Sequence, residues 1–439
     1  MGELARTPFA RALLIAGLVL LLQVPSCMIG QLGAARQQSR DEATAELART
    51  WGGRQDVIGP FLVVPYRIVV KDDKGRTTTE YSWITLLPEQ LDARAQPQVE
   101  TRRRGLFEVP VYRTHLTLTG RFAAPRLAAG AFAEAEDLQW GGAHLVLRLS
   151  DVHALDRVAP LRWGASKVDF ASGGGALTSS GIHAKLTAID PATPRDFSIE
   201  LDLRGSQGLY FAPVGGQTHA EILSAWPHPA FQGAWLPAQR EVGPQGFSAS
   251  WDITQLARGL PAAWSQSSAP TLEALNATLF GVDLLYPVDP YRMSQRSLKY
   301  STLFIGLSFL VLWLFEVLAR RPVHLGQYLL FGAALCLFYL LELSLAEHFG
   351  FALAYAVTAS AVTLQVSLYA RSALGSWRGA WLVFGVVTGL YALLYLLLRE
   401  EDYALLVGSG ALFAVLSLVM FLTRGVRWAA PSGEPAARQ

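Results

Sequence analysis

The spacing of hydrophobic and polar residues changes twice along the chain. Residues 12–22 form an apolar run behind a sparse basic tip, and the segment 54–297 then consists of short runs that alternate on a two-residue period. From Ser301 to Phe315 there is no charged residue. A helix rises about 1.5 Å per residue, so about 20 apolar residues cross a bilayer. The pattern predicts membrane helices on both sides of a β-rich body.

The first apolar run, continued to about residue 32, is long enough for a retained membrane anchor. The alternative is a lipoprotein cleavage site before Cys27, beside which Pro25 fits poorly. Residues 34–51 contain no Pro or Gly and carry good helix formers, so the anchor helix is expected to continue as a polar stalk. A glycine pair at 52–53 is expected to end it.

Short alternating runs predict a largely antiparallel sheet with one wet face. Residues 61–70 and 81–87 flank Asp72, Asp73 and Gly75, a composition that favours a β-hairpin. Further strands are expected at 108–122, 144–149, 182–189, 197–204, 219–223, 246–253 and 278–284. The linker 123–140 allows a short helix, 253–260 predicts another, and the glycine-rich segment 171–181 predicts a flexible loop.

The C-terminal third predicts a helix from about Tyr300 to Leu318, followed by apolar segments at 325–346, 349–369, 380–398 and 403–422. With the anchor, this gives six spans and places both termini on one side. Arginines predicted to lie inside are Arg6, Arg11, Arg320, Arg321, Arg371, Arg378, Arg424 and Arg427, whereas the short outer loops hold Arg399. The positive-inside rule therefore predicts cytoplasmic termini and a periplasmic β domain.

These features define a polytopic α-helical membrane protein of six spans with a large, mainly antiparallel β periplasmic domain inserted between its first and second helices. The expected divisions are an N-terminal transmembrane anchor at 1–32, a helical stalk at 33–53, the β-rich periplasmic domain at 54–297, a five-helix transmembrane bundle at 298–424 and a cytoplasmic tail at 425–439.

Composition is consistent with such a hybrid chain. Hydrophobic residues make up 51% and charged residues 16%, and the charged share is well below the roughly 25% usual in soluble domains. A net charge of +2 argues against nucleic acid as the main partner, because phosphate binding needs a concentrated basic face. The two cysteines lie in apolar segments, so no disulfide framework is expected.

Familiar catalytic signatures are absent from the sequence. It contains no GxSxG, HExxH, GxxxxGK[ST] or CxxC motif, which are the signatures of common hydrolases, zinc enzymes and phosphate-binding loops. We therefore expect a protein that is not an enzyme and that has no metal or cofactor. An envelope hydrolase without these motifs remains an alternative.

The dense basic cluster outside the predicted helices consists of Arg102, Arg103 and Arg104. Guanidinium groups bind phosphate oxygens in pairs, so this cluster is a candidate surface for the head group of an envelope lipid. The simpler interpretation is a solvated strand end.

A second candidate surface lies in the segment 224–237, SAWPHPAFQGAWLP. Trp226 and Trp235 offer flat faces to a glycan or a lipid, and His228 lies between two prolines that stiffen the segment. The simpler interpretation is a loop that fills the core or rests on the membrane.

Ionisable residues are scarce in the predicted bundle, so Glu342 is a candidate site by default. We expect it about four residues from the outer end of its helix, with Glu347 and His348 at the rim. Together they form a candidate intramembrane polar site for a proton or a cation. The simpler interpretation is a structural carboxylate that snorkels toward the interface.

Several segments together resemble the family of the inner membrane protein CreD, also called the cell envelope integrity or colicin-tolerance family. They are GPFLVVPY at 59–66, TRRRGLFEVPVY at 101–112, LYFAPVGGQT at 209–218, SAWPHPAFQGAWLP at 224–237, PVDPYRMSQRSLKYSTLFIGLSFL at 287–310 and HLGQYLLFGAALCLFYLLELSLAEHFGFALAY at 324–355. The resemblance implies an inner membrane protein linked to envelope stress, and it brings neither an enzymatic activity nor a catalytic residue.

Two functional classes follow for this chain. In the first, the β domain binds an envelope protein, lipid or glycan without catalysis, while the helices contact membrane lipids. In the second, the chain is a transporter or handles lipids. A transporter would be expected to show broken helices or charged groups near the midplane, and the apolar segments read as continuous.

Overall fold

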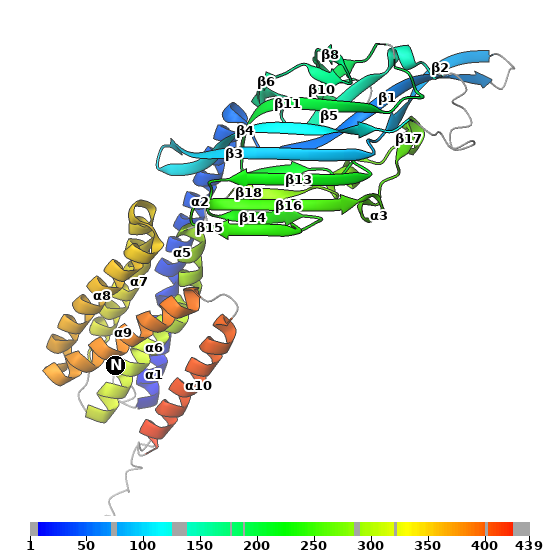
Figure 1. Cartoon of the computed structure of the whole chain (residues 1–439). Helices are drawn as coiled ribbons and strands as arrows, with labels where there is room; N and C mark the ends of the chain where they lie inside the picture. The colour runs from blue at the N-terminus through cyan, green and yellow to red at the C-terminus, as the bar shows by residue number, and fades with distance from the viewer. Residues whose placement is uncertain are drawn as a thin grey trace, which may run out of the picture. The chain divides into compact units, whose positions relative to one another are not determined.

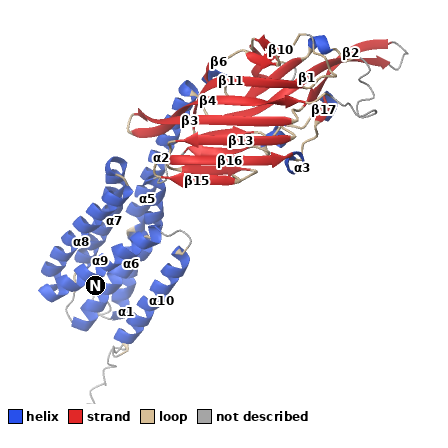
Figure 2. Cartoon of the chain, in the orientation of Figure 1, coloured by secondary structure: helices blue, strands red, loops and turns tan. Residues whose placement is uncertain are grey.

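A computed structural model of the chain describes residues 8–71, 77–124, 138–175, 178–187, 189–284, 290–319, 323–399 and 403–424. The chain forms two compact units, one comprising Met1–Arg40 with Val288–Gln439 and the other Asp41–Pro287. Figure 1 gives the order of the elements, and Figure 2 shows that strands belong to the second unit and the long membrane helices to the first. The boundaries predicted at 53/54 and 297/298 differ from this division by about ten residues.

The unit Asp41–Pro287 is built from two nine-stranded sheets. The first sheet contains β1 (Gln55–Lys71), β2 (Thr77–Leu86), β5 (His144–Leu149), β9 (Ala171–Gly174), β10 (Thr178–Lys185), β12 (Gly208–Phe211), β14 (Pro229–Gly233), β17 (Ala263–Ser265) and β18 (Phe280–Leu284). The second contains β3 (Gln90–Arg104), β4 (Phe107–Phe122), β6 (Leu155–Val158), β7 (Leu161–Trp163), β8 (Ser166–Val168), β11 (Arg195–Ser206), β13 (Gln217–Ser224), β15 (Gln239–Gly243) and β16 (Gly246–Thr254).

Antiparallel pairing dominates both sheets, as predicted. Parallel pairs join β1 to β12 in the first sheet and β3 to β13 in the second. The hairpin of β1 and β2 is confirmed by their antiparallel register, which runs from Leu62 opposite Leu86 to Lys71 opposite Thr77; its turn lies outside the described residues. Short helices are α3 (Gln255–Arg258), which lies within the predicted helix 253–260, and α4 (Leu272–Asn276).

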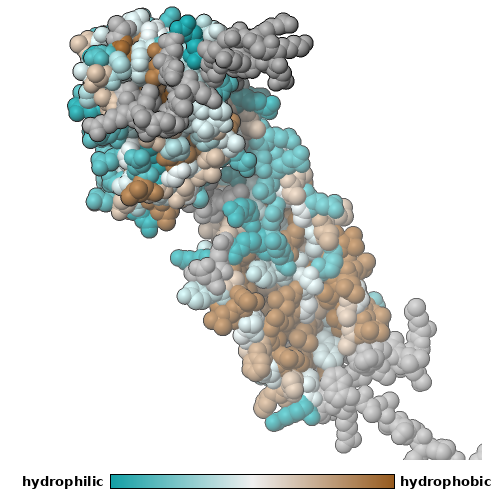
Figure 3. All heavy atoms as spheres, turned by 90° about the vertical axis from the view of Figure 1, so that its right-hand side faces the viewer, coloured by the Kyte–Doolittle hydropathy of each residue, from teal (hydrophilic) through white to brown (hydrophobic). Residues whose placement is uncertain are grey.

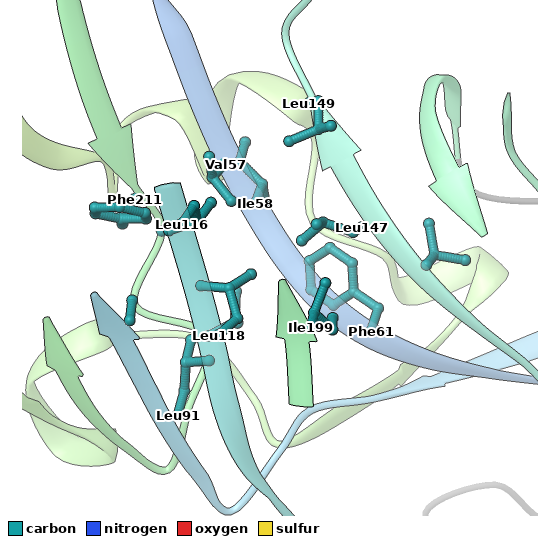
Figure 4. Packing of buried hydrophobic residues seen from close by; sticks show 14 of the residues in the cluster. Val57, Ile58, Phe61, Leu91, Leu116, Leu118, Leu147, Leu149, Ile199 and Phe211 are labelled. Carbon is teal, nitrogen blue, oxygen red and sulfur yellow. The ribbon is translucent and has the colours of Figure 1, made fainter. Parts of the chain in front are cut away.

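The hydrophobic core lies between the two sheets. Figure 4 shows Val57, Ile58 and Phe61 of β1 close to Leu116 and Leu118 of β4. Trp251 of the second sheet packs against Phe280 of the first, with ring centroids 5.5 Å apart. Because each strand alternates inward and outward side chains, one continuous apolar layer serves both sheets.

Strand β11 shows the predicted alternation. Ile199, Leu201 and Leu203 are buried, whereas the residues between them are partly exposed. The prediction of a flexible loop at 171–181 is wrong, since β9 and β10 pair there. Gly173 has a φ of 89°, a left-handed conformation that glycine allows at low cost, so the glycines shape an irregular hairpin.

The other unit is helical, and its N-terminal part is formed by α1 (Pro8–Leu21) and by α2 (Gln23–Trp51) as far as Arg40. As predicted, α2 carries the anchor onward as a stalk and ends before Gly52. The C-terminal helices are α5 (Pro290–Lys299), α6 (Ser301–Ala319), α7 (Leu325–Phe349), α8 (Phe351–Leu374), α9 (Trp377–Arg399) and α10 (Ala404–Thr423).

Within the described residues, five helices are long and apolar enough to cross a membrane, and the bent pair of α5 and α6 raises the number to six. The two helices of that pair meet at an angle of 46° beside Tyr300. The predicted apolar segment itself is one continuous helix, α6, and the bend lies at its start, after the polar helix α5. Figure 3 shows hydrophobic surface gathered over the helical unit, as is expected where lipid surrounds it.

Candidate functional sites

The three arginines of the basic cluster lie at the end of β3 and have separate acidic partners. Arg102 Nε donates to Glu100 Oε1 at 2.9 Å, and Arg103 Nη2 donates to Glu108 Oε1 at 2.6 Å. Arg104 pairs with Glu46 of the stalk helix. Successive side chains of a strand point to opposite faces, so Arg103 lies on the face opposite to Arg102 and Arg104, and each of the three guanidinium groups is paired with a different carboxylate.

Arg102 has a second contact, with the last residue of α2. Its guanidinium lies 3.6 Å from the centre of the Trp51 ring, and Arg113 and Arg204 lie 5.0 and 5.2 Å from it. The indole Nε1 donates to the carbonyl oxygen of Tyr112 at 3.4 Å. These contacts fasten the end of the stalk helix to the second sheet.

Replacing Trp51 by leucine is expected to loosen this joint. Leucine keeps apolar volume but loses the indole hydrogen bond and the cation–π contacts, together about 1–2 kcal/mol. Hydrogen exchange of the full-length protein, followed by mass spectrometry, should show faster exchange over residues 41–51. Arg103→Ala is the matched control, because its exposed ion pair contributes little. Equal exchange rates in wild type and Trp51→Leu would show that the Trp51 contacts do not hold the end of α2 on the second sheet.

The middle of the tryptophan segment is strand β14, which pairs with β18, whereas Trp226, His228 and Trp235 lie in the loop residues on either side of it. Trp226 and Trp235 are partly buried against the core. Trp226 Nε1 donates to the carbonyl oxygen of His228 at 3.1 Å, and the Trp235 ring lies edge-on to Phe280. This packing uses much of both indole rings and leaves His228 exposed at the start of the strand.

A polar hollow of about 510 Å³ opens on the first sheet close to this segment. Its polar side chains come from five separate positions in the sequence, namely Arg54, Tyr210, Gln232, Asn276 and Asp283. Sequence reasoning missed it because no local motif links them. The one usable signal was a carboxylate inside the apolar strand β18.

The polar groups of the hollow are held in place by one another. The Tyr210 hydroxyl donates to Asp283 Oδ1 at 2.5 Å, and the Arg54 guanidinium lies 3.7 Å from the centre of the Tyr210 ring. Arg54 Nε also donates to Asp56 Oδ1 at 2.8 Å. Burial, with the hydrogen bond to Asp283, raises the pKa of Tyr210 well above its usual value. The phenol is therefore a neutral donor at physiological pH.

In the helical unit, Glu342 is fully buried. This burial does not fit a side chain that snorkels toward the interface, but a hydrogen bond from α5 fits the expected structural carboxylate. Ser297 Oγ of α5 donates to Glu342 Oε2 at 2.9 Å. The side chains of Tyr339 and Tyr391 are buried in the same unit, and their hydroxyls have no hydrogen-bond partner among the described residues.

Glu347 and His348 lie in the last turn of α7 and make different contacts. Tyr291 Oη donates to Glu347 Oε1 at 3.2 Å, and Arg36 Nε lies 3.6 Å from that oxygen. His348 Nδ1 is bonded to the carbonyl oxygen of Ser344, and its ring is exposed. Glu347 therefore takes part in the polar contacts between α5 and α7, whereas His348 does not.

A second acidic residue, Glu316 of α6, is buried near the opposite end of the bundle. It forms an ion pair with Arg11 of α1, and Tyr328 Oη donates to its Oε2 at 3.1 Å. The side chain of Glu316 is 6% exposed and that of Arg11 33%. This pair links the first helix to the C-terminal helices of the same unit.

With the fold and these sites described, comparison with known proteins gives a consistent result. The family model described as "Inner membrane protein CreD" matches residues 7–429. The chain belongs to the CreD family. It is 30% identical over 417 residues to the inner membrane protein CreD of Escherichia coli K12, covering 94% of this chain and 92% of that protein. The chain is therefore a multi-pass inner membrane protein.

A structural comparison with yeast LTA4 hydrolase in complex with bestatin gives a TM-score of 0.21 at 11% identity. It covers 51% of the CreD family chain and 35% of the hydrolase. A likeness this low carries no argument about fold or activity.

Two histidines on the second sheet of the CreD family chain form simple pairs with aspartates, whereas His144 and His183 on the first sheet are hydrogen-bonded to backbone carbonyl oxygens. His115 Nδ1 lies 2.7 Å from Asp202 Oδ1, and His219 Nδ1 lies 2.7 Å from Asp252 Oδ1. Each pair joins residues directly opposite each other on neighbouring strands. Among the described residues, no group of three histidine, cysteine or acidic side chains is placed to hold a metal ion.

Proposed function

We propose that this CreD family protein supports envelope integrity and tolerance of envelope stress by non-enzymatic binding, through a β-rich unit that lies in the periplasm. The polar hollow of Arg54, Tyr210 and Asp283 carries this proposal. It is a concave site of the size that small ligands occupy, and its polar groups are already oriented. The helical unit holds that site at the inner membrane and contacts its lipids.

The proposed orientation rests on the distribution of arginines at helix ends. Arg11, Arg371 and Arg424 lie at ends that a six-span path brings to one side, whereas Arg399 lies at the end of α9 on the other side. The positive-inside rule assigns the richer side to the cytoplasm. The unit between the first and second spans then lies in the periplasm.

The chemistry of the hollow favours binding over catalysis. The Tyr210 phenol stays protonated and donates to Asp283, so neither group acts as a free nucleophile or base. Arg54 is balanced by Asp56 and Asp283 within the same region. A site with balanced charge and several hydrogen-bonding side chains suits an uncharged, hydroxyl-rich and amide-rich ligand. Of the envelope components, a glycan fragment fits this description.

The experiment uses the full-length protein in lipid nanodiscs and a soluble disaccharide-peptide fragment of peptidoglycan as the probe. Wild type is expected to bind it in calorimetric titrations. Asp283→Asn should weaken binding at least tenfold, since hydrogen bonds to a charged group contribute about 1.5–3 kcal/mol. Asp252→Asn on the other sheet is the matched control.

The same variants test the cellular role. In a strain lacking the chromosomal gene, Asp283→Asn should fail to restore survival under a cell-wall-directed antibiotic, whereas Asp252→Asn should restore it. Normal binding and normal resistance in Asp283→Asn, with equal protein levels, would refute the proposed site.

A second candidate function, transport or lipid handling, is favoured by one observation. The buried carboxylate of Glu342 accepts a hydrogen bond from Ser297, and Ser297 lies three residues before the bend at Tyr300. Broken helices beside buried polar groups are typical of transporters. Loss of resistance in Glu342→Gln, together with full resistance in Asp283→Asn, would favour this function over the first.

A further inference from the structure

Helices α5 and α7 run antiparallel and meet at two polar contacts. Tyr291 of α5 donates to Glu347 of α7, and Ser297, farther along α5, donates to Glu342. The first contact is supported by Arg36 from α2 and is partly exposed, whereas the second is fully buried. The inner contact thus places an ionisable group where water is scarce.

The surroundings of Glu342 are rich in hydroxyl groups. Ser297 donates to one carboxylate oxygen, and the hydroxyl of Ser294, one turn away on α5, is buried without a hydrogen-bond partner among the described residues. The hydroxyls of Tyr339 and Tyr391 are buried without a hydrogen-bond partner among the described residues, as is Glu342 Oε1. Unpaired buried polar groups are rare in native proteins and indicate water or a bound ion.

Basic groups near this cluster are engaged elsewhere. Arg36 of α2 pairs with Glu347, and Arg296 of α5 donates to the carbonyl oxygen of Leu397. The other titratable groups around the carboxylate are tyrosines, namely Tyr339 of α7, Tyr355 of α8 and Tyr391 of α9. Among the described residues, Glu342 forms no ion pair with a side-chain cation.

We propose that Glu342 is a proton-binding site of the membrane unit, in which the surrounding hydroxyls stabilise both states of the carboxyl group. A hydroxyl both donates and accepts hydrogen bonds. The ionised carboxylate accepts from Ser297 at Oε2, whereas the protonated acid donates from Oε1, which has no partner among the described residues, to a water molecule. The proton is taken from, and returned to, water.

A small cavity lies beside two residues of this cluster, Ser294 and Tyr339. Its volume is about 10 Å³, close to the smallest space that holds one water molecule, and it is lined by Gly30 and Gly33 of α2, Ser294 of α5 and Tyr339 of α7. The glycines leave space where larger side chains would fill the crevice. Since Ser297 binds the carboxylate more strongly than the neutral acid, the proton also sets the strength of the contact beside the α5–α6 bend.

Infrared difference spectroscopy of the full-length protein in lipid nanodiscs tests the proposal. Raising the pH should remove the C=O stretching band of a protonated carboxylic acid in wild type, and Glu342→Gln should lack this band. Glu347→Gln is the matched control and should retain it. Ser297→Ala should raise the proton affinity of the site about tenfold, because it removes a donor to the charged form.

Two results would overturn the proposal. One is an unchanged titrating band in Glu342→Gln, with elution and thermal unfolding like wild type. The other is a titration midpoint in wild type that moves with sodium concentration, which would make the ligand a metal ion. Neither readout depends on the hollow of the β-rich unit, so this proposal and the proposed function fail separately.

Discussion

Replacing Trp251 by alanine is expected to lower the free energy of unfolding of the β-rich unit by about 3–5 kcal/mol, the usual cost of truncating a buried tryptophan. The Trp251 side chain is 1% exposed and lies between the sheets. Its ring contacts Phe231 of β14 and Phe280 of β18, and its Nε1 donates to the carbonyl oxygen of Trp235. Alanine would leave a cavity where the sheets meet and an unpaired carbonyl group.

Pulse proteolysis of the full-length protein in increasing urea measures this loss, with fragments assigned to residues 41–287. Trp251→Phe should recover part of the stability, because it restores aromatic volume without the hydrogen bond. Val242→Ala on β15 is the exposed control and should change stability by less than about 0.5 kcal/mol. A midpoint for Trp251→Ala equal to that of Val242→Ala would show that Trp251 does not join the two sheets.

Replacing Arg11 by alanine is expected to destabilise the helical unit by about 3 kcal/mol. The change leaves Glu316 buried without its cationic partner, and removing one member of a buried ion pair costs far more than removing both. The double variant Arg11→Ala with Glu316→Gln should therefore be more stable than the single variant. Tyr328 can still donate to the glutamine side chain.

Thermal unfolding in nanodiscs, read by loss of monodisperse protein, compares these variants. Arg36→Ala provides the contrast, since Arg36 is largely exposed and its partner Glu347 also accepts a hydrogen bond from Tyr291. Its removal should cost at most about 1 kcal/mol. If the double variant is as unstable as Arg11→Ala, the uncompensated charge is not the cause.

The sequence predicted the parts of the fold in which pattern and packing agree. The alternation in β11 is a clear signal because one whole face of the strand is buried in the core. The apolar runs of α7 to α10 are clear signals because each whole helix is apolar enough to cross a membrane. Strand β3 was missed because its buried side is made of Leu91, Ala93 and Ala95, whose small side chains give little periodic signal. The hairpin of β9 and β10 was missed because a glycine-rich composition is typical of loops. In the structure β10 pairs with β5 on one side and with β9 on the other, and this pairing makes the segment a hairpin.

The candidate sites were predicted less well, because sites depend on contacts between distant residues. Glu342 was identifiable, since an acid in an apolar helix is unusual, but its contact with Ser297 required the bend after α5. The arginine cluster was visible as a run of charge, but not its separation by strand alternation or the role of Arg102 at Trp51. The polar hollow had no sequence signature, because its members come from β1, β12, β14, β18 and the segment beside α4.

Because β1 pairs with the distant strand β12, the first sheet cannot be completed until late in synthesis. Synthesis proceeds from the N-terminus, so β1 emerges early and can form its hairpin with β2 at once. Its other neighbours, β5 and β12, follow much later, and β18 completes that edge last. Until then a long apolar strand has an open edge, the state in which chains aggregate. Biogenesis of this protein thus depends on protecting β1 while the rest of the first sheet is still being synthesised.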